Sequence, residues 1–145
     1  MPSQTLTLLQ ASRVVDVALE KARELNCKPL TVAVLDAGGH LLALKREDGS
    51  AIMRPQIAQA KAWGALGMGH GGRELSRRAA EAPAFFAALT DISGGRIAPV
   101  PGGVLIRSSD GSVVGAVGIS GDHPDKDEAC AIYAIETAGM DADGG

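Results

Sequence analysis

The segment Ser120–Asp125 carries the densest group of polar side chains that could act on a small molecule. Pro124 suits the first turn of a helix, and amide groups at a helix N-terminus attract anions. A histidine such as His123 can act as acid, base or iron ligand near neutral pH. An alternative is a capping arrangement of Asp125 with Glu128, which needs no ligand. The candidate pocket residues of this loop are Ser120, Gly121, Asp122 and His123, with Ser120 and His123 as candidate catalytic groups.

Asp36 is a candidate general base, because it ends an apolar run and directly precedes Ala37-Gly38-Gly39. A carboxylate at the edge of a buried strand can have its pKa tuned by its surroundings and can then accept a proton. The alternative, which the sequence favours, is that Asp36 accepts hydrogen bonds from the glycine turn.

Basic residues follow this region and offer an anchor for an anion. Arg46, Arg54 and Lys61, with Asp48 beside them, are candidate ligand-binding residues. A guanidinium binds a carboxylate, such as that of a haem propionate or a small organic acid, through two parallel hydrogen bonds. A salt-bridged rim or a contact between subunits explains the same residues equally well.

Glycines and histidines supply two further candidates. Gly102 and Gly103 follow Pro101 and could present backbone N–H groups to an anion, or could simply open a strand. His70 and His123 are candidate haem-iron ligands, and His40 is the remaining histidine. No spacing of histidines and carboxylates predicts a zinc or non-haem iron site.

The composition sets limits on function. The chain has 145 residues, 46% of them apolar, and a net charge of −3, so nucleic acid is not an expected partner. Its apolar runs are too short to span a membrane, and Met1–Gln4 lacks the features of a secretion signal, so we expect a cytoplasmic protein. Cys27 and Cys130 fit no metal-binding spacing and predict free thiols.

The pattern of apolar residues predicts one α+β domain over residues 1–145, ordered over about 5–140. Thr7 and Gln10 form a capping box at the start of the first helix, which ends near Asn26. Two hairpins imply an antiparallel sheet flanked by helices. Gly115 and Gly118, inside a strand, indicate close approach of a helix or a ligand. The expected strands are 30–35, 40–44, 104–107 and 113–120; the expected helices are 52–66, 73–80, 83–89 and 124–139, with 141–145 frayed.

Four stretches together resemble the GlcG/HbpS family of haem-binding proteins. They are Val32–Gly39, Arg46–Gly49, Pro101–Val104 and Gly115–Gly121, supported by Lys61-Ala62 and Asp127–Cys130. The resemblance implies a profilin-like, five-stranded antiparallel sheet with helices on both faces, in three α/β/α layers. It also implies homo-oligomers, haem binding with haem degradation in some members, genes beside catabolic ones, and a related module in corrinoid adenosyltransferases of the PduO type.

Three functions compete at this point. The leading hypothesis is an oligomeric haem- or tetrapyrrole-binding protein with weak haem-degrading activity. The second is a cofactor-independent enzyme acting on a small carboxylic acid, with Asp36 as base, Arg46 as anchor and residues 120–123 as a polar wall. The third is a structural accessory oligomer. Only four aromatic residues are present, which favours haem bound at a surface or between subunits over deep burial.

Overall fold

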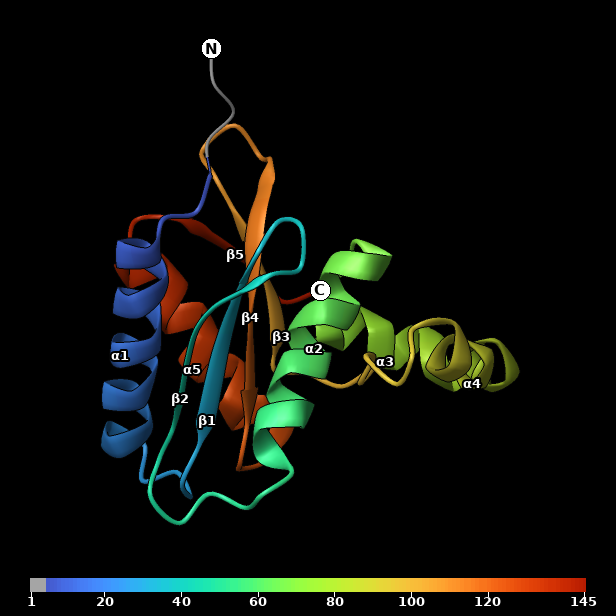
Figure 1. Cartoon of the computed structure of the whole chain (residues 1–145), viewed down its shortest axis with the longest axis horizontal. Coiled ribbons are helices and arrows are strands. Elements are labelled where there is room, and N and C mark those ends of the chain that lie inside the picture. Colours follow the sequence, from blue (N-terminus) through green and yellow to red (C-terminus); the bar gives the residue numbers. More distant parts are fainter. Residues whose placement is uncertain (1–4) are drawn as a thin grey trace.

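The structure is a computed structural model that describes residues 5–145, so the expectation drawn from Met1–Gln4 falls outside the described residues. Its centre is a five-stranded sheet in which every neighbouring pair is antiparallel, in the order β2-β1-β4-β3-β5 (Figure 1). The α+β class and the five antiparallel strands predicted above are therefore confirmed. The strands are β1 (Thr31–Asp36), β2 (Leu41–Arg46), β3 (Gly103–Arg107), β4 (Val113–Ser120) and β5 (Asp141–Asp143).

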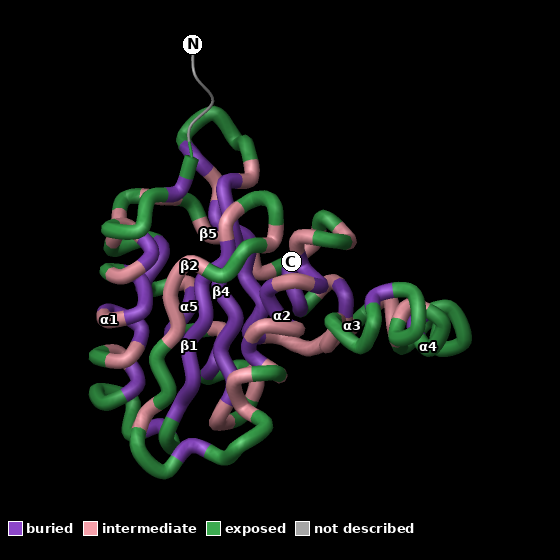
Figure 2. Tube along the Cα trace, in the orientation of Figure 1, coloured by how far each residue is buried: buried purple, intermediate pink, exposed green. Residues whose placement is uncertain are grey.

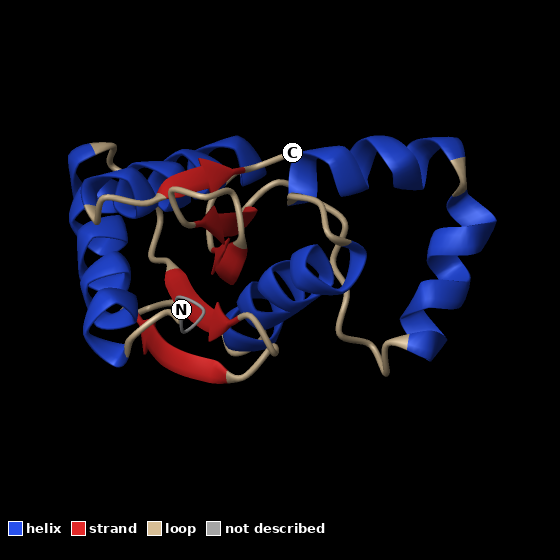
Figure 3. Ribbon diagram, turned by 90° about the horizontal axis from the view of Figure 1, so that it is seen from above, coloured by secondary structure: helices blue, strands red, loops and turns tan. Residues whose placement is uncertain are grey.

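Helices cover both faces of the sheet, as the three-layer prediction requires. Helices α1 (Leu8–Glu24) and α5 (Pro124–Thr137) pack together on one face, and α2 (Arg54–Met68) lies on the other (Figures 1 and 3). The α1/α5 side holds most of the apolar core, built on Val, Ile and Leu side chains. The α2 side has a smaller core of Leu35, Ala62, Ala65, Leu105 and Ala116.

Helix α1 begins where the sequence predicts. The Thr7 side chain accepts a hydrogen bond from the Gln10 amide at 3.1 Å, and the Gln10 side chain accepts one from the Thr7 amide at 3.0 Å. Two otherwise unpaired amides are satisfied in this way, which fixes the start of the helix. The helix then buries one face, which includes Val14, Val15 and Ala18, against the sheet.

Gly118 explains how closely α2 approaches the sheet. A Cβ atom at Gly118 would overlap the Ala58 carbonyl of α2 and lie 3.0 Å from the Ala62 amide. The close approach predicted at Gly118 is therefore made by a helix, not by a ligand, whereas a Cβ at Gly115 would overlap the Leu35 carbonyl of the neighbouring strand β1. Small side chains on the facing side of α2 make the contact, since Ala58 and Ala62 are both fully buried.

The prediction that residues 141–145 are frayed is wrong. Asp141–Asp143 forms β5 and pairs with β3, with Leu105 opposite Asp143. The Arg107 Nε donates to Asp143 Oδ2 at 3.0 Å, which adds an ion pair to the backbone ladder. This polar edge strand has too short a pattern to be recognised from sequence, and partners elsewhere in the chain hold it in place.

Two helices, α3 (Gly72–Glu81) and α4 (Pro83–Ile92), form an arm that projects from the side of the domain (Figures 1 and 3). Within residues 5–145, helix α4 packs against α3 and against no other helix or strand. Only Phe86 of its ten residues is buried. Most of the helix is exposed (Figure 2). No helix within residues 5–145 has both the length and the apolar character needed to cross a membrane.

Candidate ligand pocket

The strand register separates the predicted site residues into two groups. Strands β1 and β4 are antiparallel, with Thr31 opposite Ser120 and Asp36 opposite Gly115. Asp36 and Ser120 therefore lie at opposite ends of the sheet, roughly 17 Å apart at about 3.4 Å per residue. An enzyme site with Asp36 as base and residues 120–123 as its wall does not form within one chain.

Asp36 holds the β1–β2 turn. Its Oδ1 accepts hydrogen bonds from the Gly38 amide at 3.0 Å and the His40 amide at 2.9 Å, and lies 3.0 Å from the His40 ring Nδ1. Burial raises the pKa of Asp36, but the hydrogen bonds from the His40 amide and ring outweigh it and leave the pKa below its ordinary value. A carboxylate with a lowered pKa is a poor base, and this geometry agrees with the turn-capping interpretation.

Lys61 and Asp127 form a buried ion pair across three elements. Lys61 Nζ, on α2, donates to the Ile119 carbonyl of β4 at 2.8 Å and to Asp127 Oδ2 of α5 at 3.2 Å. The two side chains are only 4% and 1% exposed. Burial lowers the pKa of Lys61 and raises that of Asp127, and the attraction between them opposes both changes.

Gly102 and Gly103 pack directly on Lys61. A Cβ at Gly102 would lie 2.9 Å from Lys61 Nζ, and one at Gly103 would overlap the Lys61 carbonyl. These glycines and the lysine fill the space between α2 and β3, so they serve the packing of the fold.

Arg54 and Ser120 contact each other at the same end of the sheet. Arg54 Nη1 donates to Ser120 Oγ at 3.1 Å, and the Ser120 side chain is fully buried. A hydroxyl that accepts from a guanidinium and has no histidine bonded to it lacks the partner that would activate it as a nucleophile.

Arg46 and Asp48 line an open hollow of about 460 Å³ between α1 and the C-terminal end of β2. The cations around it already have partners. Arg46 Nη2 donates to the Ser50 carbonyl at 2.6 Å, and the neighbouring Lys45 pairs with Asp16 at 2.7 Å. This hollow offers little unpaired charge to a ligand.

The loop from Ser120 to α5 is held by its own hydrogen bonds. Asp122 Oδ2 accepts from the Lys28 amide at 2.7 Å, Asp122 Oδ1 accepts from the His123 amide at 2.6 Å, and Gly121 lies against the Pro29 carbonyl. His123 itself caps α5, because its Nδ1 accepts from the Asp125 amide.

The capping box predicted for Asp125 and Glu128 is wrong. His123 is the N-cap residue instead, and both carboxylates bind Arg73 of α3. The Arg73 Nη2 lies 2.6 Å from Asp125 Oδ1 and 3.0 Å from Glu128 Oε1. The two acidic side chains therefore link α5 to the base of the arm.

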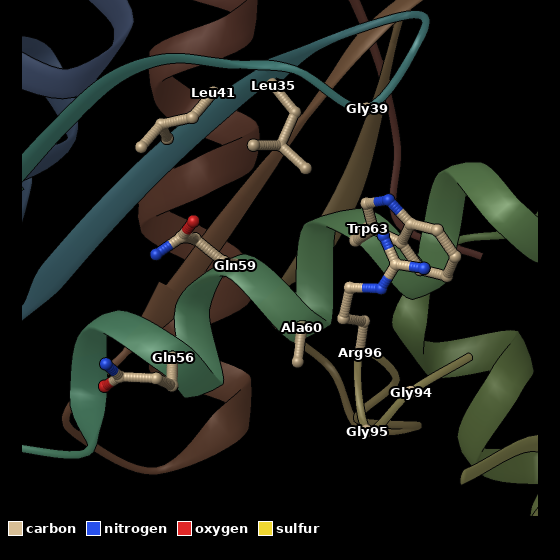
Figure 4. A pocket seen from close by; sticks show the side chains of 10 residues that line it. All are labelled: Leu35, Gly39, Leu41, Gln56, Gln59, Ala60, Trp63, Gly94, Gly95 and Arg96. Atoms are coloured by element: carbon tan, nitrogen blue, oxygen red, sulfur yellow. The ribbon is translucent and has the colours of Figure 1, made fainter. Parts of the chain in front are cut away.

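A pocket of about 400 Å³ lies on the α2 side of the sheet, at the foot of the arm (Figure 4). Its size falls within the range of ~300–1,000 Å³ usual for small-molecule sites. Strand residues, α2 and the loop that follows α4 form its walls. The lining residues are Leu35, Gly39, Leu41, Gln56, Gln59, Ala60, Trp63, Gly94, Gly95 and Arg96.

Arg96 and Trp63 form one end of this pocket. The guanidinium carbon of Arg96 lies 3.9 Å from the centroid of the Trp63 ring, a stacked cation–π contact (Figure 4). Gly39, with φ of +83°, allows the turn to approach the indole, since a Cβ there would lie 2.9 Å from Trp63 Nε1. Apolar walls, two glutamines and one cation suit a flat molecule that carries a negative charge.

The candidate iron ligands lie outside the pocket. His70 and His123 are not among its lining residues, and no group of three or more His, Cys, Asp or Glu side chains within residues 5–145 is placed to hold a metal ion. His40, at the β1–β2 turn, is 80% exposed with its ring bonded to Asp36. Iron ligation by His70 or His123 stays a prediction.

Sequence reasoning missed the Trp63–Arg96 pair. The two residues are distant in the chain and belong to no local motif. The only available signals were that Trp63 is the single tryptophan and that Gly94-Gly95 predicts a loop just before an arginine.

The antiparallel sheet with helices on both faces defines the chain as a profilin-like α+β domain. It belongs to the HbpS-like family, since the family model "Haem degrading protein HbpS-like" matches residues 6–136. Protein GlcG of Escherichia coli K12 is 37% identical over 118 residues, covering 79% of this chain and 81% of GlcG.

Solved structures agree with this assignment. A crystal structure of a PduOC–haem complex has a TM-score of 0.84 at 26% identity and covers 94% of this chain and 97% of PduOC. A double mutant of Streptomyces reticuli HbpS has a TM-score of 0.81 at 29% identity, over 94% of this chain and 89% of that one. These matches confirm the predicted resemblance.

Proposed function

We propose that this protein binds haem or a related tetrapyrrole in the pocket formed by Gly39, Trp63 and Arg96. The observation that carries the proposal is the pocket itself, in a chain whose relative PduOC is known as a haem complex. Leu35 and Leu41 offer apolar contact to a flat macrocycle, and Arg96 offers a cation to its carboxylates.

The residues present fit the organic part of haem better than its iron. The side chains that commonly ligate haem iron are His, Cys, Met and Tyr, and none of these lines the pocket. The pocket is also open to one side, so it holds an edge of the macrocycle and leaves the rest toward solvent or a second subunit. When bound, haem supplies a redox-active iron; the chain's own residues bind and orient the macrocycle.

Titration with haemin, followed by the Soret band, tests this proposal. We expect a saturable shift with the wild-type protein and a clear loss of affinity in Ala60→Trp, because an indole at position 60 fills part of the pocket. Ala129→Trp, on the exposed side of α5 across the sheet, is the matched control and should bind as wild type. Equal binding by Ala60→Trp would remove the pocket from consideration, and no Soret shift in the wild type would remove haem.

We propose weak haem degradation as a second part of this function, with an external reductant and dioxygen as co-reactants. The support is the description of the family as haem-degrading. With ascorbate in air, the Soret band of the protein-bound haem should decay faster than that of free haemin. Equal decay rates would limit the function to binding.

We also propose that the protein forms homo-oligomers through α4. Phe85 and Ile92 are 53% and 74% exposed, and Asp91 is the only charged residue of this helix. A helix that is apolar on nearly all sides is normally buried, and a second copy of α4 is a partner with the same uncharged surface.

Sedimentation velocity tests this assembly. Phe85→Glu combined with Ile92→Glu should give monomers, whereas Leu9→Glu, at an even more exposed apolar position on α1, should leave the assembly intact. A monomeric wild-type protein at micromolar concentration would contradict the proposal.

A further inference from the structure

Arg96 is fixed in place before any ligand binds. Its backbone amide donates to Ser93 Oγ at 3.1 Å, and its Nε donates to the Ser93 carbonyl at 2.7 Å. The guanidinium then stacks on Trp63. One backbone contact and two side-chain contacts therefore hold a residue whose side chain is normally flexible, which reduces the entropy lost when it binds a ligand.

The outer edge of this guanidinium is unused. Among residues 5–145, no carboxylate lies within ion-pair distance of Arg96, and its two terminal nitrogens donate to no protein acceptor. Several other arginines of the chain are paired, including Arg73 with Asp125 and Arg107 with Asp143. A stacked, fixed and unpaired guanidinium in a pocket is well suited to bidentate binding of a carboxylate.

We infer that Arg96, held on Trp63, recognises a carboxylate on the edge of the tetrapyrrole, and that the iron adds little to the affinity. This inference rests on the proposed tetrapyrrole binding and specifies which part of the ligand is read. The macrocycle lies against Leu35, Leu41 and Ala60, which are apolar, while its carboxylate edge faces Arg96; the two glutamines line the part of the pocket away from Arg96 (Figure 4).

Three ligands separate the contributions of carboxylate and iron. Haemin has both, iron-free protoporphyrin IX has only the carboxylates, and haemin dimethyl ester has only the iron. Binding is followed by ligand absorbance and by quenching of Trp63, the only tryptophan of the chain. We expect haemin and protoporphyrin IX to bind within about threefold of each other. The ester should bind about tenfold to a hundredfold more weakly, since a hydrogen bond to a charged group is lost.

Variants test the assignment to Arg96. Arg96→Gln should weaken haemin and protoporphyrin IX by the same factor, about tenfold to a hundredfold, and should leave ester binding unchanged. Arg13→Gln, an exposed arginine on α1 across the sheet, is the charge-matched control and should bind all three ligands as wild type does. Circular dichroism of each variant reports that the fold is retained.

Two results would overturn the inference while leaving haem binding intact. One is haemin binding of normal affinity in Arg96→Gln. The other is a changed haemin spectrum in His40→Ala together with no binding of protoporphyrin IX, which would show that the protein ligates the iron. Failure of every ligand to bind the wild type would instead refute the proposed function.

Discussion

Replacement of Lys61 by Met tests the contribution of the buried Lys61–Asp127 ion pair, which links α2, β4 and α5. Met keeps an unbranched apolar stem but removes the ammonium, so Asp127 is left 1% exposed with no cation beside it. Loss of one partner of a buried pair typically costs 3–5 kcal/mol. The Asp122 amide, 3.1 Å from Asp127 Oδ1, is too weak a partner to compensate for the lost ammonium. We therefore expect a loss of about 3–5 kcal/mol in the free energy of unfolding, measured by urea denaturation.

Two comparison variants sharpen this prediction. Lys45→Met breaks a shorter pair, 2.7 Å to Asp16, but its two side chains are 57% and 49% exposed, so the loss should be only about 0–1 kcal/mol. The double variant Lys61→Met with Asp127→Asn should recover most of the loss, because no lone charge remains buried.

The pH dependence gives an independent check. Burial raises the pKa of Asp127 above its ordinary value of 3.8, and removal of Lys61 removes the main opposing influence. The native state of Lys61→Met therefore binds a proton more tightly than the unfolded state. Its deficit relative to wild type should shrink as the pH falls through this raised pKa toward about 4. A loss below 1 kcal/mol for Lys61→Met, or a deficit independent of pH, would refute the reasoning.

Two further predictions concern the frame around the pocket. Gly118→Ala should lower the free energy of unfolding by about 3 kcal/mol or more, because the new methyl overlaps the Ala58 carbonyl. Gly67→Ala, on α2, makes only ordinary contacts and should be neutral or stabilise the protein by up to ~1 kcal/mol. Thermal melts that rank the two variants alike would contradict this prediction. Asp36→Ala should cost about 1–3 kcal/mol at neutral pH. The hydrogen bonds to His40 lower the pKa of Asp36, so its contribution to stability is present above pH 3.8 and is lost as the pH falls through the lowered pKa. The free energies of unfolding of wild type and variant should therefore converge in acid. A difference that stays constant with pH would contradict the role of Asp36 in the turn.

Local signals predicted much of the fold. The Thr7–Gln10 capping box, the glycine turns of both hairpins and the helix breaks each depend on residues a few positions apart. Gly118 also indicated a close approach correctly, although the sequence did not distinguish a helix from a ligand. Strand β5 was missed because Asp141-Ala142-Asp143 has no apolar alternation and is held by Arg107, far away in the chain.

The site was harder to predict, because it depends on strand register and on contacts between distant segments. Asp36 is the last residue of β1 and Ser120 is the last residue of β4. Sequence alone did not show that these strands are antiparallel neighbours, which places the two residues at opposite ends of the sheet. It also did not show that Lys61 forms a buried ion pair with Asp127, while Arg96 stacks on Trp63 without an ion-pair partner among the described residues. The sequence correctly indicated the type of residue, an arginine for a carboxylate, but it pointed to Arg46 and Arg54 and not to Arg96.

The most direct test of the central claim is a crystal structure of the haemin-saturated protein. We expect the macrocycle in the pocket against Leu41 and Trp63, with a carboxylate within hydrogen-bond distance of Arg96. Haem held instead at the Ser120–His123 loop, or with Arg96 still unpaired, would contradict it.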